Sequence, residues 1–366
     1  MKFVLSRCIA IVDILPVSVM SRNYLNSIAE YYLVGDARIS FVDLPSKTKF
    51  EDICDDSTDI LILILTTPEN KFFRKQLRRI WANKCNLGVH NIKAVMLMGH
   101  HPILSQATRE VRGSMSSLPP PNQSFEYKRR YRITHHGYVV NASIVRENLR
   151  HGDVVMVDQV ESYKNLTYKV AAGFQWGHRY CPQAKFIGKV DDDVFLGTER
   201  LMLYLQGYDG GKAIVGSHNM VYDPARWNAS RWYVTYNDYP KRVYPPYSNG
   251  FTYFMTYEYV EDMLVYLRGR RLLPVEDVQL TGLVADAIHA KRVNSFLDGG
   301  GNWTFLGDCS MLGNWLNRTG TSYEDGPISV LCFDTNYVEF ARQKLALQRL
   351  QRFARGLGLR GWPFEF

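Results

Sequence analysis

The chain has 366 residues, a formal net charge of +8, 46% hydrophobic residues and 22% charged residues. This size and apolar content predict a packed core, in one large α/β domain or two smaller ones, and exclude a disordered protein. No zinc-finger spacing or RNA-binding signature accompanies the positive charge, so nucleic acid is not an expected partner. An anionic sugar nucleotide or a membrane surface suits this charge as well.

The first 58 residues mix apolar and acidic segments without clear periodicity. The apolar run from Cys8 to Met20 contains Asp13 and Pro16, and it is shorter than the roughly 20 residues of a membrane-spanning helix. We interpret it as a weak signal peptide or a degraded anchor, with a stem behind it, so membrane association stays open. An incomplete N-terminus is the alternative.

From residue 59 onward, apolar runs alternate with helical patterns. Continuous apolar runs predict strands buried on both faces, as in a parallel sheet, at 59–66, 92–98, 153–157 and 184–188. Helical patterns fall between them, at 71–82, 144–149 and 164–176. The alternation predicts an open α/β sheet, in which ligands bind beyond the carboxyl ends of the strands.

Polar residues follow two of these predicted strands. Asp158 ends one, and three consecutive carboxylates, Asp191, Asp192 and Asp193, follow another. A row of like charges repels itself unless a cation is bound, and Mg²⁺ or Mn²⁺ prefers carboxylates together with substrate phosphates. Side chains alternate along an extended segment, so Asp191 and Asp193 should face one ligand. A solvated acidic turn is the simpler interpretation of such a triplet alone.

The second half of the chain is rich in aromatic residues. Residues 218–257 are dense in Tyr, Trp, Asn and Pro, which favours either an aromatic-packed loop or a platform for sugar rings. Glu276 and Asp277 then begin a predicted helix that runs to about Ala290, and the helix dipole should keep both carboxylates ionised. An ordinary pair of charges at a helix start is the simpler interpretation. A basic helix at 337–355 is expected to pack by one face on the domain.

The cysteines and the glycosylation sequons bear on the compartment. The six cysteines are widely spaced without a CxxC pair, which argues against a zinc site. Several Asn-x-Ser/Thr sequons favour the secretory pathway, where disulfides form. The sequons begin at Asn122, Asn141, Asn165, Asn228, Asn302 and Asn317.

Taken in order, these segments resemble the β1,3-galactosyltransferase/β1,3-N-acetylglucosaminyltransferase family of Golgi enzymes. Residues 77–81 resemble its I-R-x-T-W motif, and residues 152–169 resemble its Y-G-D-I-I, D-F, D-S-Y and N-L-T-L-K motifs. Residues 232–250 resemble W-x-V-S and Y-P-P-Y-C-S-G, and residues 276–278 resemble the start of E-D-V-Y-V-G. The motifs keep one order over about 60–290, and the resemblance fades after about residue 295.

The resemblance implies a nucleotide-diphosphosugar transferase fold of the GT-A type, with a mostly parallel open sheet and helices on both faces. The catalytic domain would span 59–335, between the segment 1–58 and a C-terminal helix in 336–366. The family implies inverting, β1,3-specific transfer of galactose or N-acetylhexosamine from a Mn²⁺-bound UDP-sugar to a glycan on protein or lipid. It also implies a signal anchor in the Golgi membrane and a lumenal catalytic domain.

The resemblance also assigns roles to individual residues. Asp277 would be the general base, which takes the proton of the attacking acceptor hydroxyl. The metal ligands would be Asp191, Asp193 and His289, the only histidine after Asp277. The donor pocket would include Arg78, Asp158, Lys169, Asp191 and Asp192. Further substrate-binding residues would be Trp232, Tyr244, Tyr247, Gly250 and Glu276.

Several positions depart from the family pattern, among them Ile80, which replaces the Thr of I-R-x-T-W. Ser248 and Leu283 stand where many members have cysteines that could bridge two loops, which fits the loss of one disulfide. Thr281 replaces the glycine of the E-D-V motif.

Two alternatives remain open: a non-catalytic or chaperone-like relative, and a metal-dependent phosphohydrolase. The phosphohydrolase would need a second carboxylate/histidine cluster that the sequence lacks.

Overall fold

The computed structural model describes residues 32–101, 131–133, 139–208, 210–219, 222–294, 305–306 and 329–331. The N-terminal apolar run and the predicted C-terminal helix lie outside these residues. Within the described part of the chain, no helix combines the length and the apolar character needed to cross a membrane.

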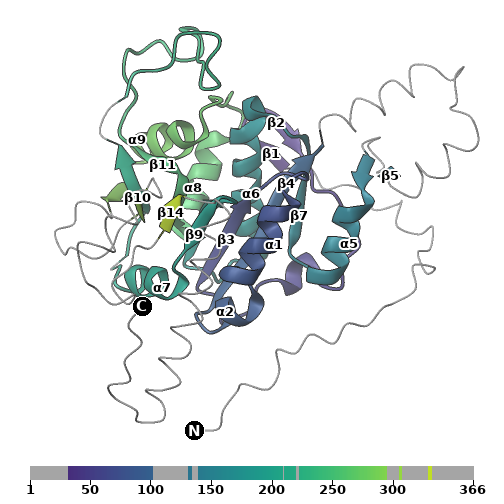
Figure 1. The fold of residues 1–366 in the computed structure, drawn as a ribbon. Coiled ribbons are helices and arrows are strands. Elements are labelled where there is room, and N and C mark those ends of the chain that lie inside the picture. Colours follow the sequence, from purple (N-terminus) through teal and green to yellow (C-terminus); the bar gives the residue numbers. More distant parts are fainter. Residues whose placement is uncertain are drawn as a thin grey trace, which may run out of the picture.

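A seven-stranded sheet forms the centre of the described domain, in the order β12-β10-β11-β8-β3-β4-β7 (Figure 1). Strand β11 runs antiparallel to both of its neighbours, and the other four pairings are parallel. The predicted α/β fold with a mostly parallel open sheet is therefore confirmed. The strands are β3 (Ile60–Leu65), β4 (Ile92–His100), β7 (Val154–Val160), β8 (Phe186–Asp191), β10 (Ala213–Asn219), β11 (Tyr247–Thr256) and β12 (Lys291–Asn294).

Helices cover both faces of this sheet, because the central strands are apolar on both sides. In β3, Ile60, Ile62 and Ile64 belong to one core cluster, whereas the leucines between them belong to the other. Helices α1 (Lys71–Ile80), α2 (Lys84–Gly88), α5 (Ala142–His151) and α7 (Thr198–Gln206) pack into the first cluster. Helices α6 (Leu166–Tyr180) and α8 (Tyr257–Leu267) pack into the second (Figure 1).

Helix α6 lies especially close to the sheet. A Cβ atom at Gly173 would come within 2.4 Å of Leu97, and one at Gly177 within 2.8 Å of Leu61. The two glycines therefore allow an approach that larger residues would prevent.

The remaining elements are short. They are β1 (Tyr32–Val34), β2 (Ala37–Ile39), η2 (Phe50–Asp52), β5 (Tyr131–Ile133), β6 (Val139–Asn141), η3 (Tyr163–Asn165), β9 (Val194–Leu196), the π-helix η4 (Val278–Leu283), α9 (Val284–Ala287), β13 (Phe305–Leu306) and β14 (Ser329–Leu331). Strands β13, β14 and β9 form a small separate sheet.

Three strands extend further than their apolar runs predicted, and the first of them, β4, continues past residue 98 to His100. Strand β7 continues past Asp158 to Val160, and β8 includes Asp191, which is paired with Leu65 of β3. Backbone pairing requires N–H and C=O groups rather than apolar side chains, so a neighbouring strand can continue the ladder through polar residues. Both aspartates are therefore held by sheet backbone.

Residues 32–58 are part of the same folded unit. The Val42 amide donates to the Met156 carbonyl over 2.8 Å, and Phe41 forms a β-bridge with Val157. Cys54 and Cys181 form a disulfide across a sequence separation of 127 residues. Among the described residues, those before the predicted boundary at residue 58 therefore fold together with the domain that follows it.

The disulfide gives a testable prediction. Replacing both Cys54 and Cys181 with alanine should lower the free energy of unfolding by about 2–5 kcal/mol, because the unfolded chain regains conformational freedom. Urea unfolding followed by circular dichroism measures this loss. A peptide map without reductant should also contain a linked 54–181 pair, and equal stability of the variant and the parent would contradict a stabilising cross-link.

Candidate active site

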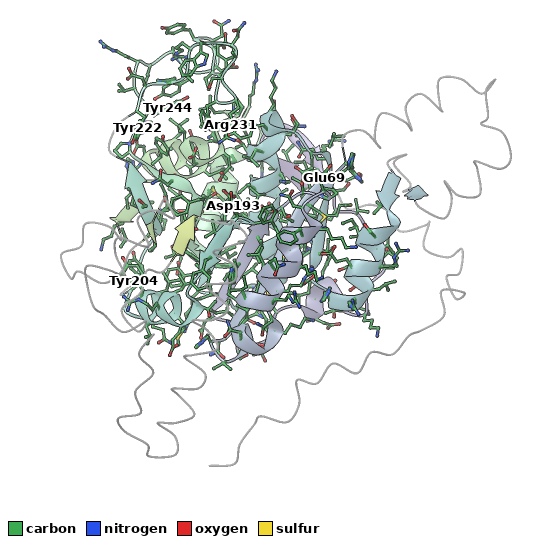
Figure 2. The ribbon with its side chains drawn as sticks, viewed as in Figure 1. Glu69, Asp193, Tyr204, Tyr222, Arg231 and Tyr244 are labelled. Atoms are coloured by element: carbon green, nitrogen blue, oxygen red, sulfur yellow. A yellow bond between two sulfur atoms is a disulfide. The ribbon has the colours of Figure 1, made fainter. Side chains whose placement is uncertain are left out.

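The candidate site lies where β8 ends and β11 begins, at the carboxyl edge of the parallel strands. The acidic run leaves β8 there, Gly250 lies in the first half of β11, and the segment after α8 brings in Glu276 and Asp277. Figure 2 shows Asp193 near the middle of the molecule, with Arg231 and Tyr244 above it on the loop that joins β10 to β11.

The acidic run is a turn rather than an extended segment. Asp191 ends β8, Asp192 and Asp193 form a turn, and β9 starts at Val194. The alternation argument for Asp191 and Asp193 was therefore wrong in its premise, because it needs extended backbone. The turn still keeps the two carboxylates close, since the charge of Asp191 acts on Asp193.

Asp192 is buried and fixes the turn from inside. Its Oδ2 accepts hydrogen bonds from Asn70 Nδ2 at 2.9 Å and from the Thr66 hydroxyl. Burial raises the pKa of Asp192, and these two hydrogen bonds oppose the rise. The contacts of Asp192 are thus with the loop after β3, which makes it a positioning residue.

Asp193 has the properties of a metal ligand. Its Oδ1 is buried and has no hydrogen-bond partner among the described residues. Burial, and then the charges of Asp191 and Asp192, raise its pKa to about 6. The Asp191 side chain beside it is 31% exposed. A hard divalent cation fits this pair, because it would supply the charge that the buried carboxylate lacks.

The described residues contain no group of three or more histidine, cysteine or acidic side chains placed to hold a metal. Asp191 and Asp193 could therefore supply only part of a coordination shell. Substrate phosphates and water are the usual remaining ligands of Mg²⁺-like ions.

Lys189 connects the acidic run to the opposite side of the site. Its buried Nζ lies 2.6 Å from Asp191 Oδ1 and 3.7 Å from Glu276 Oε2, and it donates to the Gly250 carbonyl. Burial alone would lower the pKa of Lys189, but the charges of Asp191 and Glu276 outweigh it and raise the pKa. Lys189 therefore stays charged and ties three segments together.

Glu276 and Asp277 occupy different environments. Glu276 is buried and accepts a hydrogen bond from the Tyr253 hydroxyl, and burial raises its pKa to about 7 against the opposing charge of Lys189. Asp277 is only partly buried. Its Oδ1 accepts from the Val278 amide at 2.9 Å, and a Cβ at Gly250 would lie 3.1 Å from its Oδ2. Asp277 is thus the carboxylate that substrate could reach.

The expectation that a helix dipole keeps Asp277 fully ionised needs correction. Burial raises the pKa of Asp277 above its ordinary value, although the Val278 amide opposes the rise. The predicted helix is a π-helix from Val278 to Leu283 followed by the single turn of α9. Burial of the carboxyl group therefore raises the pKa of Asp277 by more than the hydrogen bond from the Val278 amide lowers it.

Thr281 fastens the π-helix to β11. Its hydroxyl donates to the Asp277 carbonyl at 2.6 Å and accepts from the Ser248 amide at 2.8 Å. Gly282 follows it and packs against Tyr247 and Pro245. The threonine thus joins the two segments that family members could bridge with cysteines, and it fixes the backbone of Asp277.

Two of the predicted donor-pocket residues have internal partners near the site. Lys169 Nζ lies 2.8 Å from both oxygens of Glu161 and donates to the Thr66 carbonyl at 3.1 Å. Asp158 lies 2.6 Å from His100 Nε2 and accepts from the Ser40 hydroxyl at 3.2 Å. Lys169 and Asp192 both bind Thr66, Lys169 through its carbonyl and Asp192 through its hydroxyl, so Lys169 lies close to the acidic run.

Arg78 points toward the amino edge of the sheet. It pairs with Glu147 at 2.6 Å and with Asp153 at 2.7 Å, and Asp153 directly precedes β7. Arg74, one turn earlier in α1, also binds Glu147 and donates to the carbonyls of Thr67 and Pro68. Sequence reasoning missed Arg74, although its i−4 spacing to Arg78 places both on one face of α1.

His289 does not reach the acidic run. It is exposed and precedes β12, whose Lys291 pairs with Ala213 at the amino end of β10. Ile214 and Ile187 both pair with Met255, so that end of β10 lies level with the start of β8. Asp191 is therefore about 16 Å away along the strands. This spacing corrects the expectation that His289 is a metal ligand.

The aromatic residues divide into a packed group and an exposed group. Tyr244 is 5% exposed, lies in a small core cluster and contacts Tyr239 and Tyr247 with ring centroids 5.0 and 6.2 Å apart. Trp232 is 46% exposed. Of the two, Trp232 remains available to a sugar ring, whereas Tyr244 supports the loop.

Comparison with known proteins agrees with these motifs. Residues 133–295 match the family model described as galactosyltransferase. The chain is a glycosyltransferase homologue. It is 26% identical over 288 residues to lactosylceramide 1,3-N-acetyl-beta-D-glucosaminyltransferase B of Xenopus laevis, covering 72% of this chain and 67% of that protein. The predicted resemblance to β1,3-hexosyltransferases is confirmed.

Two further relatives match shorter parts. UDP-GalNAc:beta-1,3-N-acetylgalactosaminyltransferase 1 of Sus scrofa is 25% identical over 60% of this chain and 57% of its own length. Human beta-1,3-galactosyltransferase 5 is 31% identical over 40% of this chain and 47% of its own length. In these two alignments the chain spans about half the length of the relatives it matches.

Thr281 gives a prediction for this site. Thr281→Val should leave the Asp277 carbonyl and the Ser248 amide without their shared partner, and lower stability by about 1–3 kcal/mol. The backbone of Asp277 would then be less well fixed, so turnover of a sugar donor should fall more than donor binding. Thr281→Ser keeps the hydroxyl and should restore both properties. Equal loss in the serine variant would show that the methyl group, not the hydroxyl, matters.

Proposed function

We propose that the chain is an inverting, metal-dependent glycosyltransferase that moves galactose or an N-acetylhexosamine from a UDP-sugar to a glycan hydroxyl in β1,3 linkage. The observation that carries this proposal is the buried, unpartnered Oδ1 of Asp193 beside Asp191, at the sheet edge that also holds Asp277. The named relatives transfer N-acetylglucosamine, N-acetylgalactosamine or galactose, so all three remain candidate donors.

Asp191 and Asp193 are the residues that would hold the cation. A divalent ion such as Mn²⁺ would there neutralise the negative charge that develops on the diphosphate leaving group. Lys189 keeps Asp191 in place, and Asp192 keeps the turn in place through Thr66 and Asn70.

Asp277 would act as the general base. The acceptor hydroxyl must lose its proton as it attacks the anomeric carbon, and inversion requires this attack from the side opposite the leaving group. Asp277 lies beside Gly250 on β11, whereas Asp193 lies on the turn between β8 and β9. The carboxylate for the attacking hydroxyl and the carboxylate for the leaving group thus come from different segments of the chain.

Glu276 is better suited to hold this arrangement than to take the proton. It is 4% exposed, it accepts a hydrogen bond from Tyr253, and it lies beside the Lys189 ammonium. A carboxylate enclosed by these partners orients the backbone that carries Asp277.

We also propose that the catalytic domain faces the lumen of the Golgi, with membrane association through residues outside the described part. The Cys54–Cys181 disulfide supports an oxidising compartment. The sequon at Asn228 supports it too, because this asparagine is exposed on the β10–β11 loop and could accept a glycan.

The metal assignment is tested with Asp193→Asn. This change removes a buried charge while it keeps the shape, so the fold should survive. Transfer from UDP-galactose, UDP-N-acetylglucosamine or UDP-N-acetylgalactosamine should fall at least about 10²-fold, since metal charge stabilisation amounts to several kcal/mol. Calorimetry should show UDP binding that no longer increases with Mn²⁺. Asp286→Asn, which alters an exposed pair with Arg292, is the control; unchanged Mn²⁺ dependence in Asp193→Asn would refute the assignment.

The base is tested with Asp277→Asn. The amide keeps the size of the side chain but cannot take a proton, so donor binding should survive while kcat falls at least about 10²-fold. Glu276→Gln is the neighbouring control, and its effect should appear mainly in stability. Near-normal turnover of Asp277→Asn would remove Asp277 as the base, and a loss confined to Glu276→Gln would move the role by one residue.

A further inference from the structure

Arg231 holds an unusual position on the loop between β10 and β11 (residues 222–246). Its guanidinium carbon lies 4.3 Å from the centroid of the Trp232 ring and 5.7 Å from that of Tyr163. The arginine is exposed, and no carboxylate of the described residues forms an ion pair with it. Tyr163 and Trp232 are 38% and 46% exposed, so this aromatic and cationic group faces solvent.

The charges of the candidate base and of Glu276 act on this group. Burial raises the pKa of the Tyr163 hydroxyl, the charges of Asp277 and Glu276 raise it further, and the Arg231 guanidinium opposes them. The charges of Asp277, Glu276 and Arg231 therefore all act on the Tyr163 hydroxyl. Figure 2 places Arg231 above Asp193, on the side toward which the loop projects.

Other arginines nearby are already engaged. Arg226 donates to the carbonyls of Val234 and Tyr239, and Arg271 pairs with Asp238 at 3.2 Å. These contacts hold the loop in shape. Arg231 instead rests on ring faces, which bind the flat side of a guanidinium and leave its N–H edges free to bind a ligand.

The chemistry of those edges indicates the class of ligand. A guanidinium presents paired N–H donors that match the two oxygens of a carboxylate or the oxygens of a sulfate. The candidate base Asp277 must be ionised to take a proton, and its negative charge would repel an anionic acceptor. The Arg231 guanidinium, whose charge acts on Tyr163 together with that of Asp277, offsets this repulsion.

We propose that Arg231, Trp232 and Tyr163 form an acceptor subsite for an anionic sugar, in which a carboxylate or sulfate group pairs with Arg231. The exposed part of Trp232 packs against the sugar ring. This subsite rests on the proposed transfer reaction, because the charge of Asp277, the base that would activate the acceptor hydroxyl, acts on Tyr163.

The test compares matched acceptors with the full-length protein. Three oligosaccharides share one backbone, and the residue next to the accepting sugar is neutral, carboxylated or sulfated. The parent protein should prefer an anionic acceptor in kcat/KM by about 10-fold or more, the range of a charged hydrogen bond. In Arg231→Met this ratio should fall toward one, and Arg231→Lys should keep part of it. The carboxylated and sulfated arms identify which anion the subsite prefers.

Arg179 provides the matched control. It is also an exposed arginine on ring faces, 5.6 Å from the Tyr32 centroid and 5.5 Å from that of Tyr180. It lies at the C-terminal end of α6, at the amino edge of the sheet. Arg179→Met should therefore leave the acceptor preference unchanged, and an equal effect of both variants would overturn the proposal.

Direct binding separates this proposal from the proposed reaction. Calorimetry of the same oligosaccharides without donor should show anionic glycan binding that Arg231→Met loses. That loss of binding supports the subsite even if the protein transfers no sugar. An absence of sugar transfer would contradict only the proposed reaction. Equal glycan binding by the parent and Arg231→Met overturns the subsite. Binding to phosphatidylserine vesicles that depends on Arg231, without preference among the glycans, overturns it in favour of membrane contact.

Discussion

The buried ammonium of Lys189 is the interaction on which the acidic edge of the sheet depends. It lies between Asp191 and Glu276 and donates to the Gly250 carbonyl. Without this cation, the end of β8 and the segment before the π-helix would bring Asp191 and Glu276 together with no compensating charge. Removing one partner of a buried ion pair costs more than the pair contributes, since the other charge is left uncompensated. Lys189 therefore allows β8, β11 and the π-helix to meet.

Several other buried polar groups near this edge have internal partners. Lys169 pairs with Glu161, Asp158 with His100, and Asp192 with Thr66 and Asn70. The Oδ1 of Asp193, like the Oγ of Ser248, is buried without a partner among the described residues. The Asp193 oxygen differs from that hydroxyl because it belongs to a carboxylate, and a second carboxylate, Asp191, lies beside it. A cation would compensate this charge, so the pair supports the metal-dependent reaction.

The main strands and the position of the site were predictable from sequence, because apolar runs and strand-end carboxylates are local patterns. The course of β7 through Asp158 was not, since pairing with a neighbouring strand is a tertiary contact. Lys189 resembles an ordinary strand lysine until Glu276 is brought beside it. His289 was misplaced because sequence distance does not reveal at which edge of a sheet a residue lies.

The environment of Asp277 shows a second kind of limit. A carboxylate at a predicted helix start should be ionised, and the Val278 amide does favour that state. Burial against β11 acts in the opposite direction and depends on packing that no local pattern shows. The π-helix escaped prediction for a similar reason. The Thr281 hydroxyl fastens it through Ser248 of β11 as well as through Asp277, and the contact with β11 is a tertiary one.

The reversed direction of β11 has a consequence for how such a protein can diversify. Strand β10 ends at the carboxyl edge and β11 starts there, so the loop of residues 222–246 leaves and re-enters the sheet on the reacting side. Its length and composition can change at little entropic cost, because loop closure depends only weakly on length. Related proteins could thus change this loop and so bind new acceptors. The strands that carry the acidic turn would keep their register.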